Sequence, residues 1–260
     1  MKPCVKKFGG SLLRSDSDFL MVANYLSKFY KQGLPLIVVV SAQYGMTDKL
    51  IQQAMHYSPC QGEAYELLLS LGEQHSCALL SLALQSLGIP SEVFCGYRVG
   101  IHKTSKDNFE VDVNMYWRAV KQSIVIVGGF QVMNEKSQLL NLGRGGSDLT
   151  ALLIASAMNF DCELVKNVPG IFNLNDQGKR LDNFYKHITF KDLQRLLKLG
   201  SFVVQPQAVE FAEKKQYAFT VMDIHGCGTK VGGCVCSAFR DSPNKLLAAS
   251  YTDTLTQVAL

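Results

Sequence analysis

The chain has 260 residues, which is enough for one large domain or two closely joined lobes. Hydrophobic residues make up 47% of it and charged residues 18%, a composition that excludes an intrinsically disordered protein. The net charge is only +4, and no run of like charge exceeds a short pair. Nothing in the charge pattern therefore indicates binding to nucleic acid or to a membrane surface.

The N-terminal residues contain no apolar signal core, and no uninterrupted apolar stretch approaches the roughly 18 residues of a membrane helix. We therefore expect a cytoplasmic protein whose eight cysteines are reduced thiols. Cys227, Cys234 and Cys236 form one cluster near His225, but their spacing matches no standard zinc site. We predict no protein-bound metal at this cluster.

Strand and helix patterns alternate along the first half of the chain. A short apolar run that ends at Gly9 and Gly10 is followed by helical periodicity, which predicts a strand, a turn and a helix. Two later apolar runs are uninterrupted, as in strands that are covered on both faces of a parallel sheet. The expected elements here are strands at 4–8, 36–41, 91–95 and 123–127 and helices at 16–32 and 63–87.

In the second half, a helix is expected directly after a glycine-rich loop, with Ser147 and Asp148 as its capping residues. The expected elements are helices at 146–158, 189–199 and 206–215 and strands at 161–166 and 219–222, the last of which closes the sheet. This alternation predicts a three-layer αβα sandwich, an α/β fold with a largely parallel central sheet. Ligands of such a fold bind at the carboxyl ends of the strands.

Two loops combine glycines with charged residues. In the first, Lys7 precedes Gly9, Gly10 and Ser11. Glycines allow backbone N–H groups to approach a phosphate, and the lysine supplies a positive charge. On this loop alone, a tight turn beside a solvated lysine is the simpler explanation.

The second loop, at 143–148, is more specific. It places Arg144, Ser147 and Asp148 among three glycines at the start of a helix. Helix N-termini attract anions, an arginine pairs with a carboxylate or a phosphate, and an aspartate orients Mg²⁺ or a lysine. Neither loop has the spacing of the G-x-x-x-x-G-K-[ST] phosphate loop or of the G-x-G-x-x-G dinucleotide motif, so those nucleotide folds are disfavoured.

Taken in order, these loops and several shorter motifs resemble the aspartate kinases of the amino-acid kinase superfamily. The resemblance covers nearly the whole chain. The matching segments are K-F-G-G-S at 7–11, V-S-A at 40–42, G-x-T-D-x-L at 45–50, S-x-G-E-x-x-S at 70–76, K-T at 103–104, G-R-G-G-S-D at 143–148, V-P-G at 168–170, Q-P-x-x-V-E at 205–210 and G-T at 228–229.

The resemblance implies a kinase that uses ATP and Mg²⁺ to phosphorylate the side-chain carboxylate of L-aspartate, the first step of the aspartate-family amino-acid pathway. Lys7 would steady the γ-phosphoryl group, and Asp148 would organise the lysine and the metal. Glu73 would bind the substrate's amino group and Arg144 its α-carboxylate, assisted by Ser41, Thr47 and Ser147. The nucleotide would contact Lys7, Gly9, Gly10, Ser11, Lys166, Asn167, Phe172, Asn175 and Phe202. Without the resemblance, Glu73 is a solvated or ion-paired helix carboxylate, and Ser41 and Thr47 are turn formers.

Some residues expected to contact the nucleotide depart from the family pattern. Asn167 and Asn175 stand where the family has carboxylates, and Phe202 stands where it has a lysine that reaches the nucleotide phosphates. Loss of one such cation costs on the order of 10²-fold in rate. The candidates to replace it are Lys166, Lys179 and Arg180.

The resemblance divides the chain into a kinase domain at 1–236 and a C-terminal extension at 237–260. Within the domain, an acceptor lobe would end near 134 and a nucleotide lobe would span 143–236. The extension resembles the first strands of an ACT regulatory module, which cannot fold as an amino-acid sensor without the remaining strands and helices. We expect it to pair with a sheet edge of the same chain or of a second chain, and the second case would give a homodimer.

Three functions stay open at this point. The first is an aspartate kinase, which the intact set Lys7, Glu73, Arg144 and Asp148 favours. The second is a kinase for another small amino or carboxylic acid, since one fold serves many acceptors. The third is a degenerate kinase fold that acts as a binding or regulatory subunit, which the altered nucleotide side suggests.

Overall fold

The computed structural model describes residues 2–57, 62–105, 108–143, 145–175, 177–201 and 203–233. Arg144, Phe202, Cys234, Cys236 and the extension at 237–260 lie outside the described residues.

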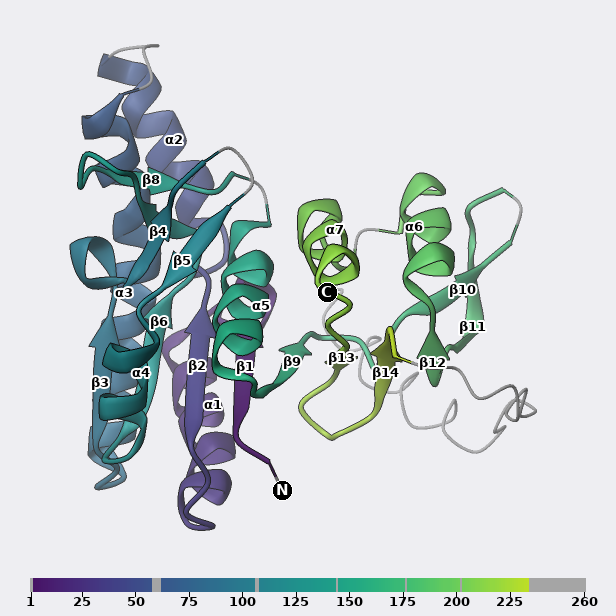
Figure 1. Cartoon of the computed structure of the whole chain (residues 1–260), viewed down its shortest axis with the longest axis horizontal. Helices are drawn as coiled ribbons and strands as arrows, with labels where there is room; N and C mark the ends of the chain where they lie inside the picture. The colour runs from purple at the N-terminus through teal and green to yellow at the C-terminus, as the bar shows by residue number, and fades with distance from the viewer. Residues whose placement is uncertain are drawn as a thin grey trace, which may run out of the picture.

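An eight-stranded sheet forms the centre of the molecule, with the strand order β12-β14-β13-β9-β1-β2-β6-β3 (Figure 1). Its strands are β1 (Cys4–Phe8), β2 (Leu36–Val40), β3 (Ser91–Phe94), β6 (Ile124–Gly128), β9 (Asp161–Val165), β12 (His187–Ile188), β13 (Phe219–Met222) and β14 (Gly228–Val231). The β13–β14 pair is antiparallel and the other pairs are parallel. The predicted α/β fold with a largely parallel sheet is confirmed.

The two faces of the sheet belong to two apolar layers. Successive side chains of a strand point to opposite faces, so Ile37 and Val39 of β2 join one layer while Leu36, Val38 and Val40 join the other. Every residue of β2 is buried, which explains its uninterrupted apolar sequence.

Helices cover both faces of this sheet (Figure 1). One layer contains side chains of α1 (Asp16–Tyr30) and α3 (Glu63–Ser86), and α2 (Met46–Tyr57) packs on α3. The other layer contains side chains of α4 (Val113–Val120), α5 (Gly146–Met158), α6 (Phe190–Lys198) and α7 (Pro206–Lys214). Nearly all residues of α5 are buried, so its sequence is apolar on all sides.

Among the described residues, α3 is the one helix that is long and apolar enough to cross a membrane. Half of its most apolar window is buried inside the protein. It buries the carboxylate of Glu73 and packs against β3 and β6, as a core helix does.

Several elements differ from the sequence predictions. The N-cap of α5 is Gly145 in the left-handed region at φ 82°, and Ser147 and Asp148 lie inside the first turn, so the prediction that they cap the helix is wrong. β13 does not close the sheet, because β14 and β12 extend it further.

Other elements were not predicted. They are the helices α2 and α4, the strands β12 and β14 of the central sheet, the four-stranded sheet of β4 (Ile101–Lys103), β5 (Phe109–Val111), β7 (Gln131–Met133) and β8 (Leu139–Asn141), the hairpin of β10 (Phe172–Leu174) and β11 (Arg180–Phe184), and the 3₁₀ turns η1 (Gly10–Leu12) and η2 (Gly96–Arg98). The central sheet runs without a break from β3 to β12, and the division into two lobes stays a prediction.

Candidate active site

The carboxyl ends of four parallel strands lie level with one another. Phe8 at the end of β1 is in register with Val40 of β2 and Val165 of β9, and Val40 is in register with Gly128 of β6. The segments that follow these strands therefore meet at one edge of the sheet. They are 9–11, 41–42, 129–130 and the position of Lys166.

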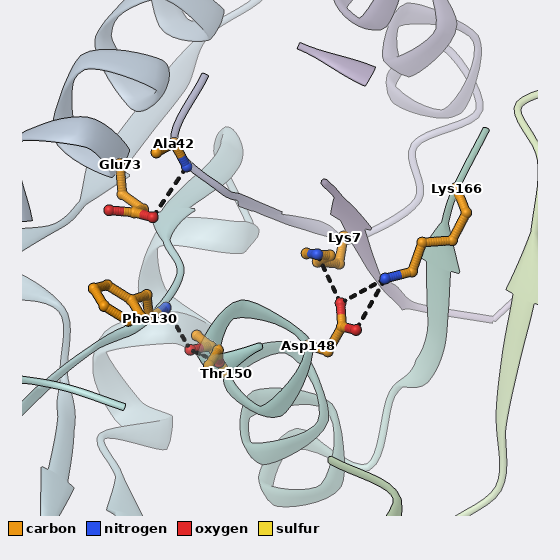
Figure 2. Close-up of polar contacts among 8 residues, drawn as sticks. Lys7, Ala42, Glu73, Phe130, Asp148, Thr150 and Lys166 are labelled. Carbon is orange, nitrogen blue, oxygen red and sulfur yellow. Dashed lines mark hydrogen bonds and ion pairs between the residues drawn. The ribbon is translucent and has the colours of Figure 1, made fainter. Parts of the chain in front are cut away.

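Asp148 lies at the centre of this edge and joins two lysines (Figure 2). The Nζ atom of Lys7 is 2.7 Å from Oδ1 of Asp148, and the Nζ atom of Lys166 is 2.9 Å from Oδ2. Lys166 also donates to Oδ1 at 3.0 Å. The Asp148 side chain is 2% exposed, so one buried carboxylate balances two cations and leaves the cluster with a net positive charge.

The electrostatics of this cluster keep Asp148 ionised. Burial acts to raise the pKa of Asp148, but the positive charges of Lys166 and Lys7 outweigh it and lower this pKa to about 2. Burial also lowers the pKa of Lys166 to about 8, although Asp148 opposes that shift. Near neutral pH the cluster thus offers two ammonium groups that are held in fixed positions, an arrangement suited to an anion such as a phosphate.

Three elements position the cluster. Lys7 is in β1 on the face towards α5, Lys166 directly follows β9, and Asp148 is in the first turn of α5. A β-carbon on Gly145 would lie 1.9 Å from Cγ of Gln205, the N-cap of α7, so only glycine allows α7 to approach the start of α5 this closely. The left-handed backbone of Gly145 adds a second reason for glycine at this position.

Glu73 forms a second polar group at the same edge. Its Oε1 accepts a hydrogen bond from the backbone N–H of Ala42 at 3.0 Å, while its Oε2 is buried without a hydrogen-bond partner among the described residues. Burial raises the pKa of Glu73 to about 7, although the Ala42 N–H and the charge of Lys7 lower it in part. An unpartnered buried carboxylate oxygen is suited to receive a cationic ligand.

Close helix–sheet packing brings Glu73 to Ala42. A β-carbon on Gly72 would lie 2.8 Å from Cβ of Ala42, so a larger residue at position 72 would push α3 away from the end of β2. Figure 2 shows Glu73 pointing towards the backbone of Ala42, with the Lys7–Asp148–Lys166 cluster on the other side of that strand end.

Phe130 belongs to this edge and was not singled out from the sequence. It has a positive φ of 71°, an unusual backbone for a bulky residue. Its N–H donates to Oγ1 of Thr150 at 3.0 Å, and its carbonyl accepts from Leu142 N–H at 2.7 Å, so α5 and the glycine loop hold the strained turn in place. The sequence signal that could have indicated it is the preceding glycine pair, Gly128–Gly129.

The other predicted acceptor residues lie near these groups. Ser41 directly follows β2, and its N–H donates to the carbonyl of Phe8. Ser147 is buried in the first turn of α5, and Thr47 is half-buried in the first turn of α2. No described hydrogen bond joins the hydroxyl groups of these three residues to Glu73 or to Asp148.

A cavity of about 490 Å³ opens beside Lys166. Of the residues predicted to bind a nucleotide, Ser11, Lys166, Asn167 and Phe172 line it. The structure places Gly9 next to Lys7, where a β-carbon would be 3.4 Å from Nζ, and Gly10 next to Ala42. Asn175 is in the turn between β10 and β11, and its side chain accepts backbone N–H groups of that turn instead of lining the cavity.

The described residues contain no group of three or more His, Cys, Asp or Glu side chains that could hold a metal ion. Asp148, which pairs with Lys166 of the cavity wall, already has a lysine on each of its oxygens. The described part of the chain therefore does not fit a metal site formed by protein carboxylates alone.

Comparison with known proteins gives consistent matches. The family model described as "Amino acid kinase family" matches residues 2–222. The chain is 32% identical over 265 residues to the aspartate kinase Ask_LysC of Stutzerimonas stutzeri, a match that covers 97% of this chain and 60% of that protein.

Solved structures match as well. The aspartate kinase from Synechocystis superposes with a TM-score of 0.77 at 33% identity, over 89% of this chain and 40% of that chain. Aspartokinase III of E. coli, solved in complex with aspartate and ADP, superposes with a TM-score of 0.69 at 19% identity over 90% of this chain and 66% of that chain, which is evidence for the fold alone. This chain thus spans about 60% of the length of the Stutzerimonas relative and less of the Synechocystis protein.

Proposed function

The chain belongs to the amino acid kinase family, and from this we propose that it transfers the γ-phosphoryl group of ATP to the side-chain carboxylate of L-aspartate. The products would be ADP and 4-phospho-L-aspartate, an intermediate of amino-acid biosynthesis. The observation that supports this most is that a positively charged cluster, Lys7–Asp148–Lys166, and a buried unpartnered carboxylate, Glu73, lie at the same sheet edge. The similarity to proteins named aspartate kinase, at 32% and 33% identity, supports the choice of acceptor.

The nucleotide would occupy the cavity beside Lys166, with its terminal phosphate towards Lys7. A carboxylate oxygen of aspartate attacks the γ-phosphorus while the bond to the oxygen that bridges the β- and γ-phosphorus atoms breaks, and ADP leaves. The attacking group is already an anion, so the step needs no base to remove a proton. The work of the protein is to position the two reactants and to stabilise negative charge on the transferring group.

The two lysines would supply that stabilisation. Each reaches Asp148 with its Nζ atom, and the carboxylate holds both ammonium groups in place without neutralising them completely. Mg²⁺ would enter with ATP and screen the phosphate charge. We assign no protein ligand to it, because the described residues do not form a metal site.

Glu73 would select an amino acid over a simple carboxylic acid. Its free Oε2 is suited to pair with the α-ammonium group, and that pairing would lower the pKa of Glu73 and hold it ionised. Arg144 would bind the α-carboxylate, as the family resemblance implies. Ser41, Thr47 and Ser147 would complete the acceptor site.

Calorimetry followed by an acceptor screen tests this proposal. Purified protein should bind MgATP and should release ADP with L-aspartate faster than with L-glutamate, succinate or acetate. Faster release with another acid would instead support a kinase for that acceptor. Nucleotide binding without turnover on any of these acids, or no nucleotide binding, would contradict the proposal and favour a binding subunit.

We also propose that the protein is cytoplasmic. A homodimer stays a prediction, which light scattering on the purified protein would test.

A further inference from the structure

Arg180 lines the 490 Å³ cavity and is stacked on an aromatic ring. Its guanidinium carbon is 3.4 Å from the ring centroid of Phe172. Phe172 is only 8% exposed, and Phe184 packs against it with a centroid distance of 5.8 Å. The guanidinium group therefore rests on a ring that is itself fixed by its neighbours.

The β10–β11 hairpin fixes this arrangement. Phe172 pairs with Phe184, and Leu174 pairs with Arg180, with a local irregularity between the two pairs. At the turn, Oδ1 of Asn175 accepts the N–H groups of Gln177 and Lys179 at 3.0 and 2.8 Å. The amide at position 175 thus shapes the hairpin that directs Arg180 to the cavity, whereas Lys179 next to it does not line the cavity.

The charges around the cavity indicate an anionic ligand. Its described lining includes two cations, Lys166 and Arg180, and no carboxylate. Lys166 is engaged by Asp148, but no ion pair joins Arg180 to any described residue. Stacking occupies the face of a guanidinium group and leaves its N–H groups, which lie in the plane at its edge, free to donate to phosphate oxygens.

We propose that Arg180 binds the phosphate groups of the nucleotide in this cavity and that Phe172 positions it for this contact. The inference rests on the proposed function in one respect, which is that the ligand is a nucleoside polyphosphate. It reassigns Phe172 from a residue that touches the nucleotide to one that acts through Arg180. One face of the Phe172 ring is already covered by the guanidinium group, so this face is not open to the nucleotide base.

Direct binding to the full chain tests the inference without any acceptor. Calorimetry would compare ATP, ADP and adenosine, each with Mg²⁺, for the wild type, Arg180→Ala and Lys179→Ala. Loss of a hydrogen bond between charged groups weakens binding by about tenfold or more. We expect that loss for ATP with Arg180→Ala, little change for adenosine, and no change for either ligand with Lys179→Ala.

The positioning role of Phe172 needs its own pair of variants. Phe172→Tyr keeps the aromatic ring and should keep the affinity for ATP, while Phe172→Leu removes the stacking surface and should lose part of it. Affinity for adenosine should be the same in both variants. Equal losses with Phe172→Tyr and Phe172→Leu, or a loss that extends to adenosine, would overturn this role.

The outcomes separate the inference from the proposed function. If Arg180→Ala weakens ATP and adenosine equally, the guanidinium group stacks on the base and the inference is overturned. Wild-type ATP binding that Arg180→Ala leaves unchanged also overturns it and leaves the proposed function standing. Selective loss of ATP affinity in a protein that phosphorylates none of the acids tested would support the inference while the proposed function fails. Absence of ATP binding by the wild type would overturn both.

Discussion

Lys6 and Lys7 are adjacent in sequence but lie on opposite faces of β1, and this alone separates their roles. Lys6 pairs with Glu163, and its Nζ atom is 4.1 Å from the ring centroid of Phe29. Lys7 faces α5 and pairs with Asp148. The alternation of side chains along a strand predicts that the two lysines diverge, but the partners of each come from segments far away in the sequence.

The first prediction compares these two lysines. Lys7→Met removes a cation that would stabilise the transferring phosphate, so kcat should fall by about 10²-fold or more in a protein that stays folded. Lys6→Met breaks a partly buried ion pair and should lower the free energy of unfolding by about 1–3 kcal/mol, with kcat within a few-fold of the wild type. Steady-state kinetics and urea unfolding measure both effects. The reverse pattern, with activity lost in Lys6→Met and kept in Lys7→Met, would refute the assignment of Lys7.

The second prediction concerns Glu73 and pH. Burial raises the pKa of Glu73 from its usual 4.5 to about 7, so the folded protein holds a proton that the unfolded chain releases between these values. The contribution of Glu73 to the free energy of unfolding of the wild type should therefore fall as the pH rises from about 4.5 to about 7. Above pH 7 this contribution should stay constant. Glu73→Gln does not titrate. The Tm of Glu73→Gln minus that of the wild type should increase from about pH 4.5 to pH 7 and then stay constant.

Glu135→Gln is the control for this measurement, because Glu135 is an exposed carboxylate in the turn between β7 and β8. Its Tm should follow the wild type at every pH. A Tm difference for Glu73→Gln that does not change with pH would show that the Glu73 carboxylate is already ionised in the folded protein at low pH, contrary to the burial described here.

At the scale of elements, the predicted site depends on close approaches of helices to strand ends. α3 reaches the end of β2 at Gly72, and α7 reaches the start of α5 at Gly145. The sequence marks these positions as glycines within motifs, but it does not show what each glycine touches. The same limit applies to the cap of α5, where Ser147 and Asp148 fit the usual capping pattern although the glycine before them has the capping role.

Substitution of Gly72 tests the helix approach. Gly72→Val places atoms where Cβ of Ala42 lies, so α3 must shift, at a cost of about 1–3 kcal/mol in the free energy of unfolding. The shift separates Glu73 from Ala42, and KM for the amino acid should rise more than KM for ATP. Gly62→Ala, at the N-cap of the same helix, is the control, because a β-carbon there meets no atom within 4 Å. Equal changes in both KM values would mean that Gly72 supports the fold in general and not the acceptor site.

The elements with the most buried residues were the easiest to predict. β1, β2, β6, α1, α3 and α5 present long or periodic apolar patterns, and the structure has them close to the expected residues. α2 has no buried residue. Its sequence nevertheless carries apolar residues at helical spacing, Met46, Leu50 and Ala54, a pattern that the prediction missed. β4, β5, β7 and β8 have three residues each, too few to show an alternating pattern.

For the whole molecule, the sheet edge unites segments that are up to about 160 positions apart in the sequence. Lys7, Asp148 and Lys166 come together only because β1 lies between β2 and β9, an order that local patterns do not contain. The family resemblance placed Lys7 and Asp148 together as catalytic residues and assigned Lys166 to the nucleotide, and the structure adds how the three meet. It also adds the stacking of Arg180 on Phe172, for which the sequence offered Arg180 only as one of three nearby cations.

Trapping of the acyl phosphate with hydroxylamine tests the central claim most directly. Purified wild-type protein with MgATP, millimolar L-aspartate and hydroxylamine should form aspartyl hydroxamate in step with ADP, and Lys7→Met under the same conditions should form almost none. Absence of hydroxamate with the wild-type protein, while an established aspartate kinase forms it in the same assay, would contradict phosphoryl transfer to aspartate at this site.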